Sequence, residues 1–167
     1  MRPHAVKGNN SKVSALRFLQ EFLVRPADVG ALAPSGRDLA MAVSSAAGVP
    51  QASVVVEFGP GTGAITEIIV EQIPQQAKFF AIEINPTFVD IVQKRFPDVH
   101  VIHDSATNTL EHLHGIGEDS CDCIVSGLPW TAFRDSLQVA LLDAVSQCLR
   151  PGGRFATYMY IQSQFLP

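Results

Sequence analysis

The segment Val55–Thr66, VVEFGPGTGAIT, places three glycines directly after a short apolar run and directly before a helical pattern. Glycine lacks a Cβ, so a loop with glycine at 59, 61 and 63 adopts backbone angles that other residues avoid and lets a ligand approach closely. A strand that runs into such a loop and then into a helix is typical of α/β domains that bind phosphate, a dinucleotide or another nucleotide-derived ligand. The rest of the chain has to decide among these ligands.

Downstream of residue 52 the chain alternates between strand-like and helical patterns. Apolar runs predict strands at 53–58, 78–84, 98–103, 121–127 and 154–161. Helical periodicity predicts helices at 63–73, 86–96 and 135–149, the last closed by an Arg-Pro-Gly-Gly turn at 150–153. This alternation predicts βαβ units, and therefore a doubly wound α/β domain with a mostly parallel sheet and helices on both faces.

The N-terminal part has a different pattern. Residues 12–25, KVSALRFLQEFLVR, predict an amphipathic helix that ends at Pro26, and Ser35 is a candidate N-cap for a second helix. We therefore divide the chain into an N-terminal amphipathic arm with its loop, residues 1–34, and an α/β domain, residues 35–167.

Charge is distributed unevenly between these two parts. Residues 1–26 hold five Lys and Arg residues against Glu21 alone, whereas the remainder holds seven basic and 15 acidic residues. The acidic body argues against a broad nucleic-acid surface, which is normally basic. A basic amphipathic helix suits an anionic membrane surface, where each basic residue contributes about 1 kcal/mol. Packing of the same helix on the domain is an alternative that the pattern leaves open.

Other compositional features give expectations about environment and metals. No apolar run reaches the ~18 residues of a membrane span, and the N-terminus lacks the pattern of a signal peptide. The three cysteines, Cys121, Cys123 and Cys148, are expected to be buried thiols in a reducing compartment. The histidines at 100–114 lack zinc-ligand spacing, so we expect no metal site.

The residues around the glycines narrow the choice of ligand. No Gly-Lys-Ser/Thr follows the loop, which excludes a P-loop. Ala64 stands where the dinucleotide pattern G-x-G-x-x-G has its third glycine. Glu57, two residues before the first glycine, would repel a pyrophosphate as a carboxylate and suits a ligand that carries an ammonium group.

Two further acidic residues follow the next two predicted strands. Glu83 ends the second strand, where a carboxylate can accept hydrogen bonds from both ribose hydroxyls of a nucleotide. Asp104 follows the third strand, where it can accept a hydrogen bond from an adenine amino group. Because the carboxyl ends of parallel strands meet at one edge of a sheet, these acids are expected to line one site.

The segments EFGPGTG, AIEIN, HDS and SGLPW, in this order, resemble the motifs of class I S-adenosylmethionine-dependent methyltransferases, with their Rossmann-like fold, over roughly residues 53–160. The resemblance implies that the glycine loop wraps the methionine portion of S-adenosylmethionine, that Glu83 holds its ribose, and that Asp104 and the Ser105 amide read its adenine. The cofactor contacts implied are Ser35, Glu57, Gly59, Gly61, Thr62, Gly63, Glu83, Ile84, Asp104, Ser105 and Ser126.

The segment SGLPW, residues 126–130, bears on the methyl acceptor. It is similar to the Asn/Asp-Pro-Pro-Tyr or Asn-Leu-Pro-Tyr segment with which amine methyltransferases and rRNA adenine dimethylases grip the target nitrogen. Gly127 stands at the Asn position, a departure that disfavours base methylation. Together with FLQEFLVRPADVGALAPSGRDLAMAV and RFATYMYIQSQFLP, the segment resembles bacterial phospholipid N-methyltransferases, which convert phosphatidylethanolamine stepwise to phosphatidylcholine.

This second resemblance implies methyl transfer from S-adenosylmethionine to the amine of phosphatidylethanolamine, by a cytoplasmic protein associated peripherally with the inner, anionic face of the membrane. The residues expected around the acceptor are Gly127, Leu128, Trp130, Tyr158 and Tyr160. An RNA adenine N6-methyltransferase relative and a non-catalytic S-adenosylmethionine-binding module remain as alternatives. No nucleic-acid partner is expected, and the sequence leaves the oligomeric state open.

Overall fold

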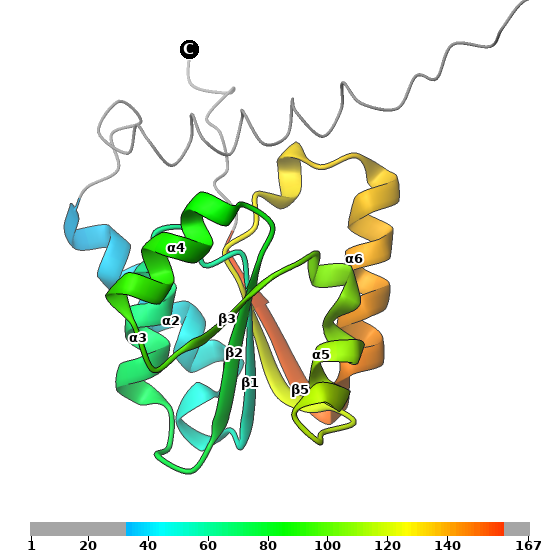
Figure 1. Cartoon of the computed structure of the whole chain (residues 1–167), viewed down its shortest axis with the longest axis horizontal. Helices are drawn as coiled ribbons and strands as arrows, with labels where there is room; N and C mark the ends of the chain where they lie inside the picture. Colours follow the sequence, from blue (N-terminus) through cyan, green and yellow to red (C-terminus); the bar gives the residue numbers. More distant parts are fainter. Residues whose placement is uncertain (1–32, 159–167) are drawn as a thin grey trace, which may run out of the picture.

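A wholly parallel five-stranded sheet forms the centre of the computed structural model, which describes residues 33–158. The predicted arm helix at 12–25 and Tyr160 lie outside the described residues. In spatial order the strands are β3 (His100–His103), β2 (Lys78–Glu83), β1 (Val54–Phe58), β4 (Cys121–Ser126) and β5 (Leu149–Thr157) (Figure 1). The predicted parallel α/β fold is therefore confirmed.

Helices cover both faces of this sheet. Helices α2 (Ala33–Ala47), α3 (Ala64–Gln72) and α4 (Pro86–Arg95) lie on one face, and α5 (Thr109–Gly115) and α6 (Asp135–Cys148) lie on the other (Figure 1). Three short 3-10 turns, η1 (Val49–Gln51), η2 (Ala106–Asn108) and η3 (Trp130–Ala132), complete the described elements. All five residues of β1 are buried, which explains why its sequence is a nearly continuous apolar run.

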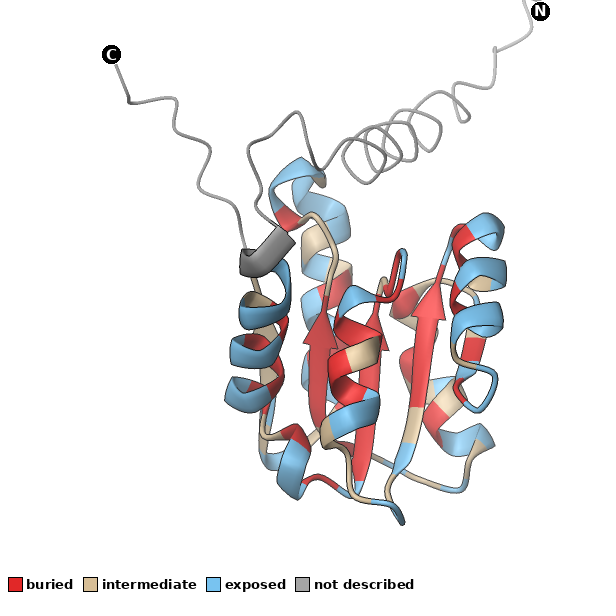
Figure 2. Ribbon diagram, turned by 90° about the vertical axis from the view of Figure 1, so that its left-hand side faces the viewer, coloured by how far each residue is buried: buried red, intermediate tan, exposed pale blue. Residues whose placement is uncertain are grey.

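The alternation of side chains along β1 divides the core into two layers. Val54, Val56 and Phe58 pack on the α5/α6 side, whereas Val55 packs on the α2/α3 side. Figure 2 shows buried residues along the strands and on parts of the helices that pack on them. The three cysteines are buried free thiols, as expected, and burial raises the pKa of Cys121 and Cys123 to about 12.

The structure corrects two sequence expectations at element ends. Helix α2 begins at Ala33, so Ser35 lies inside its first turn and is not the N-cap. Proline is tolerated in a first helical turn because no backbone N–H is needed there, so Pro34 does not delay the helix start. The predicted domain boundary at residue 35 consequently falls within this helix.

The Arg-Pro-Gly-Gly segment is the second correction. Residues 150–153 do not separate helix α6 from the last strand but lie within β5, which begins at Leu149. Leu149 pairs with Cys121 and Arg154 pairs with Cys123, so the four residues between them form an irregularity in the ladder. None of the described helices has the length and apolar character required to cross a membrane.

Asp122 joins three strands at the amino end of the sheet. Its Oδ2 accepts hydrogen bonds from the backbone N–H groups of Ser53 at 2.7 Å and Val54 at 2.8 Å. Its Oδ1 lies 2.8 Å from a guanidinium nitrogen of Arg150. One carboxylate on β4 thus satisfies the donors at the start of β1 and a cation on β5.

We expect Asp122→Ala to lower the free energy of unfolding by about 1–3 kcal/mol, because it leaves two backbone donors and a guanidinium without their acceptor. Urea denaturation of the purified protein measures this change. Asp90→Ala, at an exposed position of α4, serves as the control and should change stability by no more than about 0.5 kcal/mol. Equal effects of the two substitutions would contradict the role given to Asp122.

Candidate functional site

The carboxyl edge of the sheet gathers polar side chains from neighbouring strands. Glu57 lies near the end of β1, Glu83 at the end of β2 and Ser126 at the end of β4. Asp104 follows β3, and its backbone N–H donates to the Glu83 carbonyl at 3.2 Å. The structure therefore brings the three predicted acids to one edge of the sheet.

The glycine loop connects β1 to α3 at this edge. Gly59, Gly61 and Gly63 have φ values of 65°, 58° and 88°, in the region that favours glycine. A Cβ at Gly59 would lie 2.5 Å from the Leu128 side chain, and one at Gly63 would lie 2.7 Å from the Phe96 ring. Backbone conformation and close packing together explain the three glycines.

Helix α4 holds the outer side of this loop. The Arg95 guanidinium donates to the Thr62 carbonyl at 3.0 Å and also pairs with Glu67 on α3. The Thr62 side chain is exposed. Arg95 is a positioning contact for the loop that sequence reasoning missed.

Glu57 is fully buried, and only one of its two carboxylate oxygens has a partner among the described residues. Its Oε2 accepts a hydrogen bond from the Thr66 hydroxyl at 2.8 Å, whereas Oε1 has none. Burial raises the pKa of Glu57 to about 8, and the nearby Glu83 carboxylate adds to the rise. Glu57 therefore carries a proton at neutral pH in the protein alone, and the repulsion of pyrophosphate expected from the sequence needs its ionised form.

Glu83 connects the glycine loop to the end of β2. Its Oε2 accepts from the Gly61 N–H at 3.2 Å, and its Oε1 accepts from the Asn85 N–H at 2.9 Å. Burial raises the pKa of Glu83, while these backbone donors oppose the rise. A carboxylate has about four acceptor positions, so Glu83 keeps acceptor capacity beyond its backbone donors, which is what ribose hydroxyls require.

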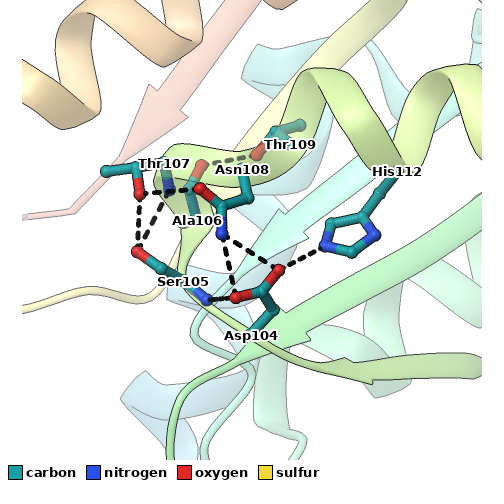
Figure 3. A network of polar contacts seen from close by, with 7 residues as sticks. All are labelled: Asp104, Ser105, Ala106, Thr107, Asn108, Thr109 and His112. Carbon is teal, nitrogen blue, oxygen red and sulfur yellow. Dashed lines mark hydrogen bonds and ion pairs between the residues drawn. The ribbon is translucent and has the colours of Figure 1, made fainter.

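Asp104 differs from these two acids because it is partly exposed and richly hydrogen-bonded (Figure 3). Its Oδ1 accepts from the Ser105 N–H at 2.7 Å, and its Oδ2 accepts from His112 Nε2 at 2.8 Å. The Asn108 amide donates to both oxygens, at 3.0 Å and 3.1 Å. These donors, the Ser105 amide foremost, lower the pKa of Asp104.

The segment that follows β4 packs directly on the glycine loop. The Gly127 N–H donates to the Phe58 carbonyl at 2.8 Å, and a Cβ at Gly127 would lie 2.7 Å from the Gly59 carbonyl oxygen. The Leu128 side chain lies against Gly59. Position 127 therefore has no room for any side chain, an asparagine amide included.

Trp130 and Ser126 form an internal pair. The Trp130 Nε1–H donates to Ser126 Oγ at 3.0 Å, and the indole ring meets Phe155 edge-to-face with centroids 5.5 Å apart. Trp130 is only 7% exposed, and Ser126 is completely buried. In this arrangement the indole ring is part of the core, because its N–H donates to Ser126 and the ring packs on Phe155. The expected contact of Trp130 with the acceptor remains a prediction.

The other predicted site residues take varied positions. Ile84 is 55% exposed at the end of β2, an unusual environment for a large apolar side chain. Tyr158 is half-buried and packs on the α2/α3 side of the core. Ser35 lies in α2, and Tyr160 lies outside the described residues. The roles given to these four residues remain predictions.

Sequence reasoning missed the side chains that support the acids. Thr66 could have been predicted from the sequence, because it lies one helical turn after Gly63, where its side chain faces back toward β1. Asn108 and His112 belong to η2 and α5, which the apolar periodicity did not predict. Within residues 36–158, no group of three His, Cys, Asp or Glu side chains is arranged to hold a metal ion.

Comparisons with known proteins agree with this geometry. Residues 55–153 match the family model described as a methyltransferase domain. The chain is 31% identical, over 141 residues, to an ornithine lipid N-methyltransferase of Singulisphaera acidiphila, covering 83% of this chain and 73% of that protein.

Two solved structures show the same fold at low sequence identity. The first is a Burkholderia thailandensis 1,6-didemethyltoxoflavin-N1-methyltransferase with bound S-adenosylhomocysteine, at 20% identity and a TM-score of 0.61; the match covers 94% of this chain and 65% of that one. The second is S-adenosylmethionine-bound CalS10, an amino pentose methyltransferase from Micromonospora echinaspora, at 17% identity and a TM-score of 0.57; the match covers 94% of this chain and 59% of that one. The chain thus spans less than two thirds of these solved proteins.

The raised pKa of Glu57 predicts a specific pH dependence of stability. The folded state keeps the proton up to about pH 8, whereas the unfolded chain loses it near pH 4.5, so the free energy of unfolding should fall as pH rises between these values. The slope from one group is at most about 1.4 kcal/mol per pH unit. Glu57→Gln, which mimics the protonated acid, should flatten this slope.

Urea denaturation of the cofactor-free protein at pH 5, 6.5 and 8 measures the slope. Glu111→Gln, at an exposed position of α5, is the matched control and should leave it unchanged. If Glu57→Gln retains the slope of the parent protein, Glu57 is already ionised across this range and the prediction is wrong.

The close contact at position 127 predicts that even a methyl group is harmful there. Gly127→Ala should displace the glycine loop and weaken cofactor binding by about tenfold or more, since overpacking costs about 1–3 kcal/mol. Calorimetry with S-adenosylhomocysteine measures the affinity. Gly115→Ala is the control, because a Cβ there meets nothing within 4 Å. Unchanged affinity in Gly127→Ala would show that the loop can yield.

Proposed function

Because the chain belongs to the S-adenosylmethionine-dependent methyltransferase family, we propose that it transfers methyl groups to the amine of a membrane aminolipid, with phosphatidylethanolamine as the substrate that the sequence predicts. The observation that carries this proposal is the 31% identity to an ornithine lipid N-methyltransferase across 83% of the chain. Phosphatidylethanolamine and an ornithine headgroup share a primary amine on a flexible stem, and this is the acceptor chemistry proposed.

The residues at the carboxyl edge suit the proposed cofactor. The unpartnered Oε1 of Glu57 supplies an acceptor for the ammonium group of the methionine portion, which favours the ionised carboxylate. Glu83 offers its remaining acceptor capacity to the ribose hydroxyls, and exposed Ile84 offers apolar surface to the adenine. Asp104 offers its carboxylate to the adenine amino group.

Bound S-adenosylmethionine supplies an activated methyl group on its sulfonium, so the protein has to position the attacking amine and keep water away. The backbone carbonyls of residues 126–128 are proposed as acceptors for the amine, because Gly127 brings this segment against Gly59. Tyr158, the residue directly after β5, is proposed to orient the amine. An aminolipid arrives as an ammonium and loses a proton before it attacks.

The steric limit at Gly127 favours an aminolipid over a nucleic-acid base. Base methyltransferases of the resembled families use a side-chain amide at this position, and no side chain fits there in this chain. A flexible headgroup amine needs fewer fixed acceptors than a planar base held in a stack. The basic pattern of residues 1–26 supports action at an anionic membrane surface, where the substrate resides.

Transfer of tritiated methyl groups tests the proposal with three acceptors in parallel: phosphatidylethanolamine vesicles, ornithine lipid vesicles and unmethylated rRNA. We expect incorporation into one or both lipids, none into rRNA, and faster transfer when the vesicles contain an anionic lipid. Glu83→Gln should lose most of the activity, whereas Glu71→Gln, at an exposed position of α3, should keep it.

Each other outcome has a definite meaning. Transfer to ornithine lipid alone would correct the substrate but keep the class of reaction. Transfer to rRNA alone would overturn the aminolipid assignment. Cofactor binding without transfer to any acceptor would favour a non-catalytic module.

A further inference from the structure

Asp104 is held by donors from three elements of its surroundings (Figure 3). Oδ1 takes the Ser105 N–H, Oδ2 takes His112 Nε2 on α5, and the Asn108 amide at the end of η2 bridges both oxygens. A carboxylate accepts only, so His112 must carry its hydrogen on Nε2. The orientation of the carboxylate and the tautomer of the imidazole therefore fix each other.

His112 is itself held from two further sides. Its ring meets Phe80 of β2 edge-to-face, with centroids 6.5 Å apart. The next residue, Leu113, is completely buried and anchors α5 on the sheet. The imidazole thus has a fixed position relative to the end of β3, and its Nε2 stays directed at Asp104.

The carboxylate would be poorly fixed without these donors. Rotation about the last side-chain torsion of Asp is soft, because an sp³–sp² torsion has broad, roughly two-fold minima. The Ser105 amide contacts Oδ1 alone, and the bridging Asn108 amide can keep one oxygen while it releases the other to a new donor. His112 is therefore the contact that holds Oδ2 when an incoming amino group displaces Asn108.

We propose that His112 is a positioning residue that orients the Asp104 carboxylate toward the 6-amino group of the cofactor purine and so determines selectivity for adenine. This inference rests on the proposed function, because it takes Asp104 as the adenine acceptor. An oriented carboxylate accepts from a 6-amino group and repels a 6-oxo group. A carboxylate that has lost the donor at Oδ2 can turn that oxygen away from either group, so discrimination between them falls.

The affinity for S-adenosylhomocysteine divided by the affinity for S-inosylhomocysteine is the ratio that tests this proposal. S-adenosylhomocysteine and S-inosylhomocysteine differ at position 6 of the purine and at the neighbouring N1, which carries a hydrogen only in the 6-oxo purine; calorimetry with the full chain gives the affinity for each. General damage to the fold weakens both ligands equally and leaves their ratio unchanged. A loss of orientation lowers the ratio.

The matched variants are His112→Gln and His112→Met, which have similar length and shape, but only the Gln side chain keeps an N–H donor. We expect His112→Met to lower the ratio about tenfold, the usual order for one hydrogen bond to a charged group, and His112→Gln to retain most of it. His114→Met, on the exposed side of the same helix, is the control and should retain the parent ratio. If His112→Met does not fold, His112→Leu takes its place in the comparison.

Asp104→Asn separates failure of the inference from failure of its premise. A parent-like ratio in Asp104→Asn would show that Asp104 does not read the adenine, which overturns the proposed cofactor arrangement. A collapsed ratio in Asp104→Asn together with a parent-like ratio in His112→Met would overturn the role of His112 alone. Equal ratios in the Gln and Met variants would also contradict the role of its N–H.

Discussion

The contact between the loops that follow β1 and β4 is the constraint on which the rest of the site depends. These strands are neighbours, and the Gly127 N–H donates to the Phe58 carbonyl, so the backbone after β4 lies directly against the glycine loop. The Leu128 side chain leaves no volume for a Cβ at Gly59, and the Gly59 carbonyl leaves none for a Cβ at Gly127. The shape of the glycine loop and the lack of a side chain at position 127 are thus two results of one packing requirement.

The three acids at the carboxyl edge are in physically different states. Glu57 and Glu83 are desolvated, which favours their protonated forms, whereas Asp104 is partly exposed and is kept ionised by its donors. The same side-chain chemistry thus lies in a desolvated environment under the glycine loop and in a partly exposed, richly hydrogen-bonded one beyond β3.

Much of this arrangement follows from the sequence because the strongest signals are local. The apolar runs that became β1, β2 and β4 are long and bounded by turn residues, and the acids follow the strands in chain order. The features that the sequence did not predict depend on contacts between distant segments. Helix α5 has seven residues, too few to show clear periodicity, so His112 appeared only as a histidine with the wrong spacing for zinc. The burial of Trp130 in η3 depends on contacts with Ser126 on β4 and with Phe155 on β5.

The sequence interpretations were also incomplete where several structures satisfy one local rule. Ser35 suits an N-cap, but Pro34 suits a first turn equally, and the helix begins earlier. Pro-Gly-Gly suits a turn, yet the ladder with β4 accommodates it as an irregularity of β5. Local sequence preference marks such residues as unusual, and the segments that they pair with in the fold determine the structure that they adopt.

The absence of room at Gly127 has a consequence for how such an enzyme changes its substrate. A position that tolerates no side chain offers no variation for selection to act on, so under the proposed function acceptor preference has to change at the neighbouring positions. Thr131 and Ala132, which are exposed in η3 just after the rigid segment, are free to vary without disturbing the cofactor loop. Under the proposed function, evolution or a protein engineer would therefore alter Thr131 and Ala132 and leave Gly127 unchanged.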